Sequence, residues 1–221
     1  MFKFVTASVV KRYNSFCSDK LNQLKMILSN KYKLECDIEL IGSGAKNLVT
    51  QNENEPFDLD YNLIINSFSQ DFDINSPNNL KQLKDTIKNK LNKILGDTYF
   101  KDAQDSTSVL TARLFFTDDP KKKEFSFDIA ILTKSKNGNY CRLIHEKSPC
   151  DRFFWNEVPR SNDVYEKAEE LKECGWWQDV RKTYLKLKNM YLKRNDYNHP
   201  SYIVYVEVVN QIYAEFENYT E

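Results

Sequence analysis

The chain has few of the residues on which metal hydrolases and disulfide-rich domains depend. Among its 221 residues only two are histidines, His145 and His199, which argues against a zinc hydrolase or a Ser-His-Asp enzyme. The five cysteines are odd in number, and no two of them have the CxxC spacing of a zinc site. We therefore expect reduced thiols and a cytoplasmic protein. If the chain is an enzyme, we expect carboxylates to carry its chemistry.

Long apolar runs and an excess of one charge are also missing. No apolar run approaches the roughly 20 residues that cross a bilayer, and the N-terminus lacks the apolar stretch of a signal peptide. Lysine and arginine total 32, as do aspartate and glutamate, so the formal net charge is zero. This balance argues against a DNA-coating protein or a polybasic membrane binder, and it disfavours a long nucleic-acid substrate.

What the sequence does contain is enough apolar material for a core, with 41% hydrophobic and 14% aromatic residues. Apolar residues at steps of three and four predict helices at 7–30 and 80–94, and Ser76-Pro77 is a start signal for the second. Alternating or β-rich segments predict strands at 34–41, 57–65, 107–116, 125–132 and 140–144.

The chain changes character after about residue 148. The later segments predict helices at 161–173, 176–194 and 201–219. The last of these also has a β-branched stretch at 202–209 that suits a strand. We therefore expect an α+β half followed by a mainly helical half that packs on it, because no flexible linker separates the two.

Three aspartates carry the clearest chemical signal. Asp58 and Asp60 are two residues apart in an alternating strand, so both side chains point to its polar face, roughly 7 Å apart. Asp128 has the same polarity in the strand at 125–132, and adjacent strands would bring the three carboxylates together. Their repulsion favours a compensating cation, and hard oxygen ligands suit Mg²⁺ or Mn²⁺. An exposed polar sheet face is the alternative interpretation.

A glycine-containing turn is the candidate phosphate cradle. Gly42-Ser43 follows a predicted strand, so backbone N–H groups there would face an anion, and glycine permits a close approach. A plain strand-to-helix turn is the alternative. Lys46 is a further phosphate-binding candidate, with a solvated side chain as its alternative, and Arg113 faces either the site or the solvent.

Taken in order, Ile41-Gly42-Ser43, Phe57-Asp58-Leu59-Asp60-Tyr61 and Phe127-Asp128-Ile129 resemble the signature of the DNA polymerase β-type nucleotidyltransferase superfamily. The resemblance covers roughly residues 34–133. One departure is the spacer of 14 residues between Ser43 and Asp58, slightly longer than the family usually shows, and the polar loop at 51–56 is where the excess fits. The resemblance implies a mixed sheet flanked by helices, with a catalytic domain at 1–148 and a helical region at 149–221.

By this resemblance the chain transfers a nucleoside monophosphate from a nucleoside triphosphate, such as ATP, to a hydroxyl acceptor and releases pyrophosphate. Asp58 and Asp60 would hold two Mg²⁺ or Mn²⁺ ions. Asp128 would hold the catalytic ion and help to deprotonate the acceptor.

The resemblance also implies which groups bind the triphosphate. Gly42 and Ser43 would contact it, together with a lysine of the helix at 176–194. Lys186 and Lys188 are the two candidates for that lysine, and Lys188 is favoured.

The acceptor is not specified by the residues, and neither is the oligomeric state. The chain is longer than minimal single-domain members of the superfamily. It looks short for members that build oligonucleotides or cyclic dinucleotides, so a small-molecule or protein hydroxyl is slightly preferred. The alternative function is a non-catalytic module of the same fold that binds a nucleotide or a protein. The intact set of three aspartates argues against that alternative, and no membrane partner is expected.

Overall fold

The computed structural model describes residues 1–116, 119, 122–159, 162–196 and 198–220. The described residues fall into two units. The sheet unit comprises Thr6–Lys46 and Glu55–Val158, and the helical unit comprises Met1–Val5, Asn47–Asn54 and Pro159–Glu221. None of the helices in the described part of the chain is long and apolar enough to cross a membrane.

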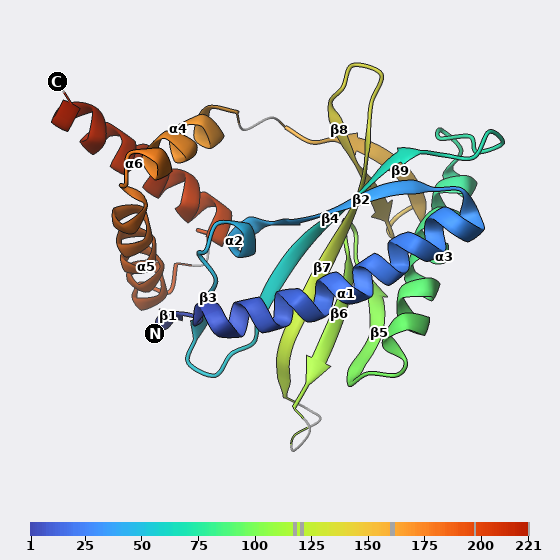
Figure 1. Cartoon of the computed structure of the whole chain (residues 1–221), viewed down its shortest axis with the longest axis horizontal. Coiled ribbons are helices and arrows are strands. Elements are labelled where there is room, and N and C mark those ends of the chain that lie inside the picture. Colours follow the sequence, from blue (N-terminus) through green and yellow to red (C-terminus); the bar gives the residue numbers. More distant parts are fainter. Residues whose placement is uncertain (117–118, 120–121, 160–161, 197, 221) are drawn as a thin grey trace. The chain divides into compact units, whose positions relative to one another are not determined.

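A mixed sheet forms the centre of the sheet unit (Figure 1). Among the described residues, five of its strands are ordered β2-β4-β7-β6-β5, with β8 paired to β7 and β9 paired to β8. The pairing of β4 with β7 is parallel, and the other pairings are antiparallel. The strands are β2 (Glu35–Ile41), β4 (Phe57–Ser67), β5 (Phe100–Asp105), β6 (Leu110–Phe115), β7 (Lys123–Lys134), β8 (Tyr140–Glu146) and β9 (Arg152–Glu157). The α+β fold class with a mixed sheet flanked by helices is therefore confirmed.

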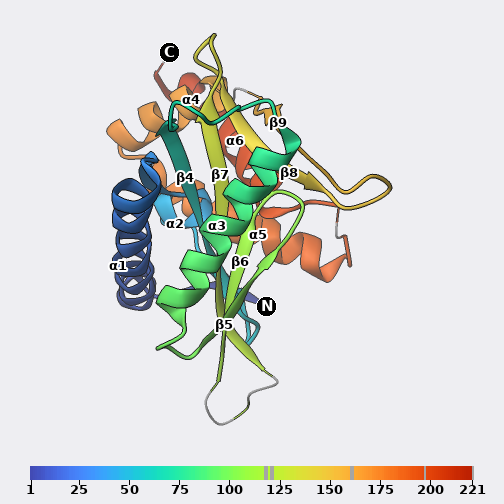
Figure 2. The same ribbon diagram turned by 90° about the vertical axis from the view of Figure 1, so that its right-hand side faces the viewer.

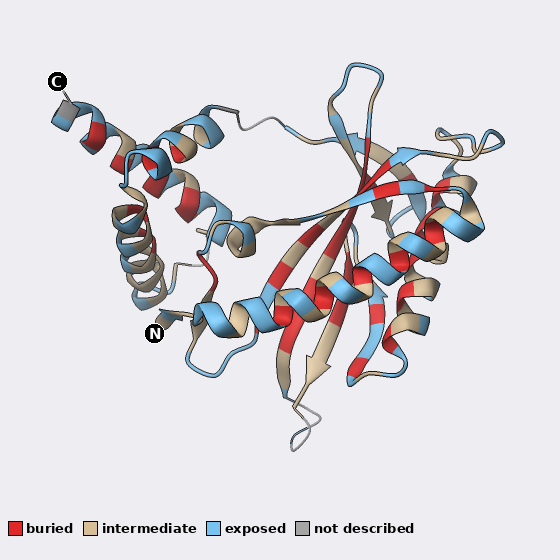
Figure 3. Cartoon of the chain, in the orientation of Figure 1, coloured by how far each residue is buried: buried red, intermediate tan, exposed pale blue. Residues whose placement is uncertain are grey.

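Two long helices, α1 (Ala7–Tyr32) and α3 (Pro77–Leu95), lie on one face of this sheet (Figure 2). The ring of Tyr13 on α1 packs against Phe57 and Phe125, with ring centroids 5.3 and 4.4 Å apart. Ser76 caps α3 by accepting a hydrogen bond from the N–H of Asn79, as its start signal predicted. Buried residues gather along β4, β7 and one side of α1 (Figure 3). The main core therefore lies between the sheet and these two helices.

Side chains alternate along a strand, so the other face of β4 and β7 carries the predicted site residues. That face also holds a small apolar cluster of Ile64, Ala130 and Leu132, each 3% exposed. The short helix α2 (Gly42–Ala45) follows β2 directly and ends the strand beside this face.

The helical unit is built from α4 (Asn162–Glu173), α5 (Trp177–Lys193) and α6 (Ser201–Thr220), with a small antiparallel pair of strands, β1 (Phe2–Phe4) and β3 (Thr50–Asn52). Its core is formed by apolar residues of all three helices, together with Leu48 from the segment before β3.

The structure resolves one element that the sequence left open and changes the bounds of others. The ambiguous stretch at 202–209 is helical, because the buried residues Val204, Val208 and Ile212 recur at helical spacing in α6. The strand expected at 107–116 is shorter, at Leu110–Phe115. The helix expected at 161–173 is α4, and the first residue of that range lies outside the described residues.

Four strands, β1, β3, β5 and β9, were not predicted, and β9 falls in the part of the chain expected to be mainly helical. Each has at most 6 residues, and such short segments carry too little periodicity to be recognised before their partners are known.

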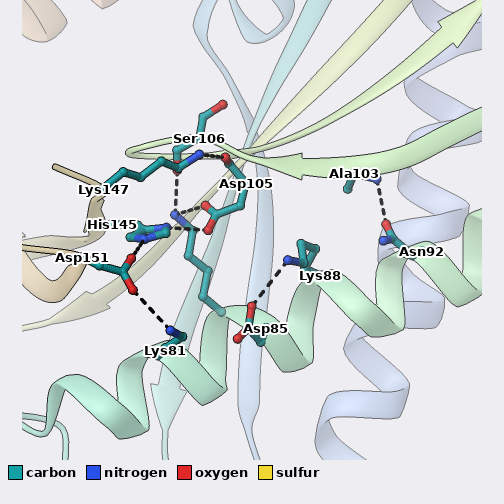
Figure 4. Close-up of polar contacts among 11 residues, drawn as sticks. Lys81, Asp85, Lys88, Asn92, Ala103, Asp105, Ser106, His145, Lys147 and Asp151 are labelled. Atoms are coloured by element: carbon teal, nitrogen blue, oxygen red, sulfur yellow. Dashed lines mark hydrogen bonds and ion pairs between the residues drawn. The ribbon is translucent and has the colours of Figure 1, made fainter.

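A buried polar cluster ties α3 to β5 and β8 (Figure 4). The Nζ of Lys84, a residue only 2% exposed, lies 2.7 Å from Asp105 Oδ1 and donates to the carbonyl of Ser106. His145 Nδ1 lies 2.6 Å from the other Asp105 oxygen, and its Nε2 lies 2.6 Å from Asp151 Oδ1. Burial acts to raise the pKa of Asp105, but its bonds to Lys84 and His145 outweigh burial, and the pKa lies below its ordinary value.

Candidate active site

The parallel register of β4 and β7 brings the three predicted aspartates together. Asp60 is the Cα partner of Asp128, and Asp58 is the Cα partner of Ser126, so all three side chains share one face. A carboxylate oxygen from each of the three lies within 4.8 Å of one from each of the others. Asp58 is exposed, whereas Asp60 and Asp128 are half-buried. The arrangement is thus a carboxylate cluster on the open face of the sheet.

The electrostatics of this cluster disfavour full ionisation. Burial raises the pKa of Asp60 to about 6, and the charges of Asp58 and Asp128 add to the rise. Lys46 and Arg142 oppose it. The raised pKa of Asp60 therefore reflects burial first and the two neighbouring carboxylates second.

The pKa of Asp128 is also raised. Burial raises its pKa, and a hydrogen bond from the Thr111 hydroxyl acts in the opposite direction. Thr111 on β6 is the Cα partner of Asp128, so its hydroxyl lies beside the Asp128 carboxylate. The Oδ1 atom of Asp128 is buried and has no hydrogen-bond partner among the described residues. Three converging carboxylates with an unsatisfied buried oxygen fit a hard divalent cation such as Mg²⁺ or Mn²⁺.

Gly42 is required at the edge of the cluster for two reasons. Its φ is +61°, in the left-handed region that favours glycine. A Cβ atom at this position would lie 2.6 Å from Asp60 Oδ2, closer than such atoms approach. Ile41, the residue before it, is the Cα partner of Asp60, so the turn begins directly beside the carboxylates. Lys46 Nζ donates to the Gly42 carbonyl at 3.3 Å, and Ser43 is half-buried in the same turn.

The long spacer between Ser43 and Asp58 has a structural use. Part of the polar loop expected at 51–56 forms β3, which pairs with β1. Leu48, just before β3, is 1% exposed in the core of the helical unit. The extra chain length therefore builds a strand of the helical unit.

The two candidate lysines of α5 differ in their surroundings within the helical unit. Lys188 Nζ donates to Thr50 Oγ1 at 2.9 Å and to Ser201 Oγ at 3.0 Å, and it lies 4.1 Å from the centre of the Phe2 ring. Lys186 lines a separate hollow on α5. Lys188 thus faces β3, which follows the Gly42 turn in sequence, and its contact with a triphosphate stays a prediction.

Other polar groups on the open face were missed or left open by the sequence. Arg113 is the Cα partner of Ser126, so it lies on the site face; it donates to Gln104, and its charge opposes the raised pKa of Asp128. Thr111 was not selected from the sequence as a site residue, although it lies two positions before Arg113 on β6 and points to the same face. Arg142 on β8 gave no sequence signal, because only the pairing of β8 with β7 brings it near the aspartates.

No protein-family model and no curated protein sequence matches the chain. Among solved structures, CdnC of E. coli MS115-1 with ATP is similar over 93% of this chain, with a TM-score of 0.53 and 16% identity. The complex of CdnC with HORMA-deltaN is similar over 94%, with the same TM-score and identity. The Vibrio cholerae di-nucleotide cyclase DncV with GTP is similar over 77%, with a TM-score of 0.51 and 9% identity.

These similarities concern the fold. The chain spans 61% of the CdnC chain bound to ATP, 60% of the CdnC chain in the HORMA complex and 47% of the DncV chain. All three structures are of DNA polymerase β-type nucleotidyltransferases. The present chain has their fold, so the resemblance read from its motifs is confirmed at that level.

Proposed function

We propose that this chain, with its nucleotidyltransferase fold, transfers a nucleoside monophosphate from a nucleoside triphosphate to a hydroxyl acceptor and releases pyrophosphate. The observation that carries the proposal is the convergence of Asp58, Asp60 and Asp128 beside a turn in which a Cβ atom at Gly42 would clash with Asp60. Three carboxylates that repel one another suit a site where a divalent cation offsets their charge and a phosphate group binds that cation.

In this proposal the three aspartates hold Mg²⁺ or Mn²⁺. When bound, the metal neutralises charge on the transferring phosphoryl group and lowers the pKa of the attacking hydroxyl. Gly42 and Ser43 present backbone N–H groups to the triphosphate, and the missing side chain of Gly42 lets it approach Asp60. Asp128 also helps to take the proton of the acceptor hydroxyl.

Further parts of the proposal concern the chain as a whole. Residues 1–148 form the catalytic domain, residues 149–221 form a helical region, and Lys188 contacts the triphosphate. The protein is cytoplasmic and does not use long nucleic acids. A small-molecule or protein hydroxyl is the first candidate acceptor. A second nucleotide is another candidate, because the similar DncV is a di-nucleotide cyclase. The CdnC complex with HORMA-deltaN makes a protein partner a further proposal.

The decisive experiment combines binding and turnover. Wild type is heated with ATP, GTP, CTP or UTP, each with and without Mg²⁺, and pyrophosphate release is followed in parallel. We expect a Mg²⁺-dependent rise of Tm for at least one nucleotide, and its loss in Asp58→Ala. Asp128→Ala should fold and lose pyrophosphate release, whereas the exposed control Asp19→Ala should keep it.

Two outcomes would decide against catalysis. Wild-type turnover in Asp128→Ala would refute the assigned chemistry. Nucleotide binding without pyrophosphate release, for every acceptor offered, would support the non-catalytic binding module instead.

A further inference from the structure

The open face of the sheet continues beyond the aspartates, toward β8. Asn62 follows Asp60 at the next position of β4 that points to this face, and its Cα partner on β7 is Ala130. One step further, Ile64 pairs with Leu132, and Leu132 pairs with Arg142 on β8. Three strands thus bring an amide and a guanidinium to the same face as the carboxylates, beyond Asp60 and on the side away from Asp58.

Both of these side chains carry an unsatisfied buried atom. Asn62 Oδ1 and Arg142 Nε have almost no exposed surface and no hydrogen-bond partner in the part of the chain that the structure describes. Buried polar atoms are satisfied in the great majority of native structures, so each exception needs an explanation. A ligand with a hydrogen-bond donor would satisfy the Asn62 oxygen, and an anionic group on the same ligand would satisfy the Arg142 guanidinium.

The charge of Arg142 acts on the carboxylate cluster. Together with Lys46 it opposes the rise in the pKa of Asp60. Arg142 therefore lies close enough to influence Asp60 electrostatically, although it comes from a strand that does not pair with β4.

The order of groups along β4 separates a Gly42 side of Asp60 from an Asn62 side. The antiparallel register of β2 and β4 puts Gly42, the residue after Ile41, on the Asp58 side of Asp60, and Asn62 is on the other side. In phosphoryl transfer the attacking oxygen and the leaving oxygen lie roughly in line across the phosphorus. If the pyrophosphate leaves toward the Gly42 turn, the nucleophile enters from the side of Asn62 and Arg142.

We propose that Asn62 and Arg142 form the subsite for the acceptor, and that the acceptor is a small hydroxyl compound bearing a phosphate or carboxylate group. This inference rests on the proposed function. Arg142 pairs with the anionic group, and Asn62 Oδ1 accepts a hydrogen bond from an O–H or N–H of the same molecule. The acceptor oxygen forms a bond to the α-phosphorus, the bond from that phosphorus to pyrophosphate breaks, and the hydroxyl proton passes to Asp128. Both residues are positioning residues, because the reacting atoms lie at the aspartates.

The test separates acceptor binding from donor binding. ATP and GTP serve as donors and as nucleotide acceptors, and glycerol 3-phosphate and glycerate serve as non-nucleotide acceptors, with glycerol as an uncharged control. The variants are Arg142→Met, Arg142→Lys and Asn62→Ala. Arg152→Met, on the neighbouring strand β9, is the matched control because this arginine is exposed. Pyrophosphate release gives the acceptor KM and kcat, and the thermal shift with Mg²⁺ and ATP reports the donor site.

We expect wild type to use at least one anionic acceptor and to disfavour glycerol. Arg142→Met should raise the KM of that acceptor about 10-fold or more, as for loss of one charge-assisted hydrogen bond. Arg142→Lys should recover part of this loss, Asn62→Ala should raise the same KM, and Arg152→Met should not change it. The thermal shift with Mg²⁺ and ATP should persist in all four variants. Preference for the nucleotides or for the other anions identifies the source of the anionic group.

Three results would overturn the subsite. The first is an unchanged acceptor KM in both Arg142→Met and Asn62→Ala. The second is loss of the Mg²⁺–ATP shift in Arg142→Met, which would assign the arginine to the donor. The third is wild-type use of glycerol as readily as the anionic acceptors. If Arg142→Met does not fold, Arg142→Lys and Asn62→Ala decide by the same KM criterion. Failure of the proposed function is distinct, because wild type would then show neither the Mg²⁺-dependent shift nor pyrophosphate release.

Discussion

Replacing Asp60 by asparagine should stabilise the metal-free protein, although it removes a central residue of the proposed site. The folded carboxyl group has a pKa of about 6, raised from 3.8 by burial and by its two acidic neighbours. A carboxyl group with a raised folded pKa destabilises the fold once it ionises. Its penalty is therefore absent below pH 3.8, grows as the pH rises, and is complete above about pH 6.

The size of the penalty follows from the shift. Each pKa unit corresponds to about 1.4 kcal/mol, and solvent screening at a half-buried site reduces the total, so we expect about 1–3 kcal/mol at pH 7.5. Asparagine keeps the shape without the charge. Asp60→Asn should then raise Tm by a few degrees, at about 2–4 °C per kcal/mol for a chain of this size.

Mg²⁺ should reverse the order of stability. A cation that binds only the folded protein stabilises wild type by mass action, whereas Asp60→Asn has lost a ligand and should gain little. Urea unfolding followed by tryptophan fluorescence, in EDTA and in Mg²⁺, at pH 4 and pH 7.5, measures both effects. The exposed Asp19→Asn on α1 is the matched control. A variant less stable than wild type in EDTA at pH 7.5, or a gain that is the same at pH 4, would refute the reasoning.

Three other predictions concern the turn, the buried polar cluster and α5. Gly42→Ala places a methyl group 2.6 Å from Asp60 Oδ2 at a φ of +61°, so it should abolish the Mg²⁺-dependent nucleotide shift and destabilise the fold by about 1–3 kcal/mol, measured by thermal and urea unfolding. Asp105→Asn leaves a buried lysine without its charged partner and should reduce the free energy of unfolding by about 3–5 kcal/mol at pH 7. Because the pKa of Asp105 is lowered in the folded state, its contribution in wild type is present above about pH 4 and is lost as the pH falls through the folded pKa, so the variant and wild type should converge in acid titrations of unfolding. In pyrophosphate release assays, Lys188→Met should raise the KM for the nucleoside triphosphate more than Lys186→Met does. Equal effects would contradict the choice of Lys188 as the triphosphate-binding lysine.

Local geometry explains how far the site was predictable. Asp58 and Asp60 are two positions apart in one strand, so their common direction follows from the pleat alone. Asp128 required one further assumption, that its strand neighbours β4, and the parallel register satisfies it by pairing Asp128 with Asp60. Asn62 shares the alternation of Asp58 and Asp60, but nothing in the sequence marked it as a site residue, and a lone arginine in a hairpin, such as Arg142, has no periodic signature.

The helical half shows the same division between local and long-range information. Local composition left residues 202–209 open between helix and strand, since β-branched residues suit both. Burial of Val204 and Val208 against the other helices of the unit decided for α6. Likewise, the spacer after Ser43 has the composition of a polar loop. Only its pairing with β1, about 50 residues earlier in the chain, makes part of it the strand β3.

The amino-acid sequence by itself determined the local features: the alternation that puts Asp58 and Asp60 on one face, the glycine of the candidate turn, and the apolar periods of α1 and α3. Only the tertiary structure decided what surrounds them. The pairing of Asp60 with Asp128, the position of the Gly42 turn beside Asp60 and the place of Arg142 on β8 all depend on strand register. Register is set by packing between segments that lie far apart in the chain, and no local periodicity encodes it.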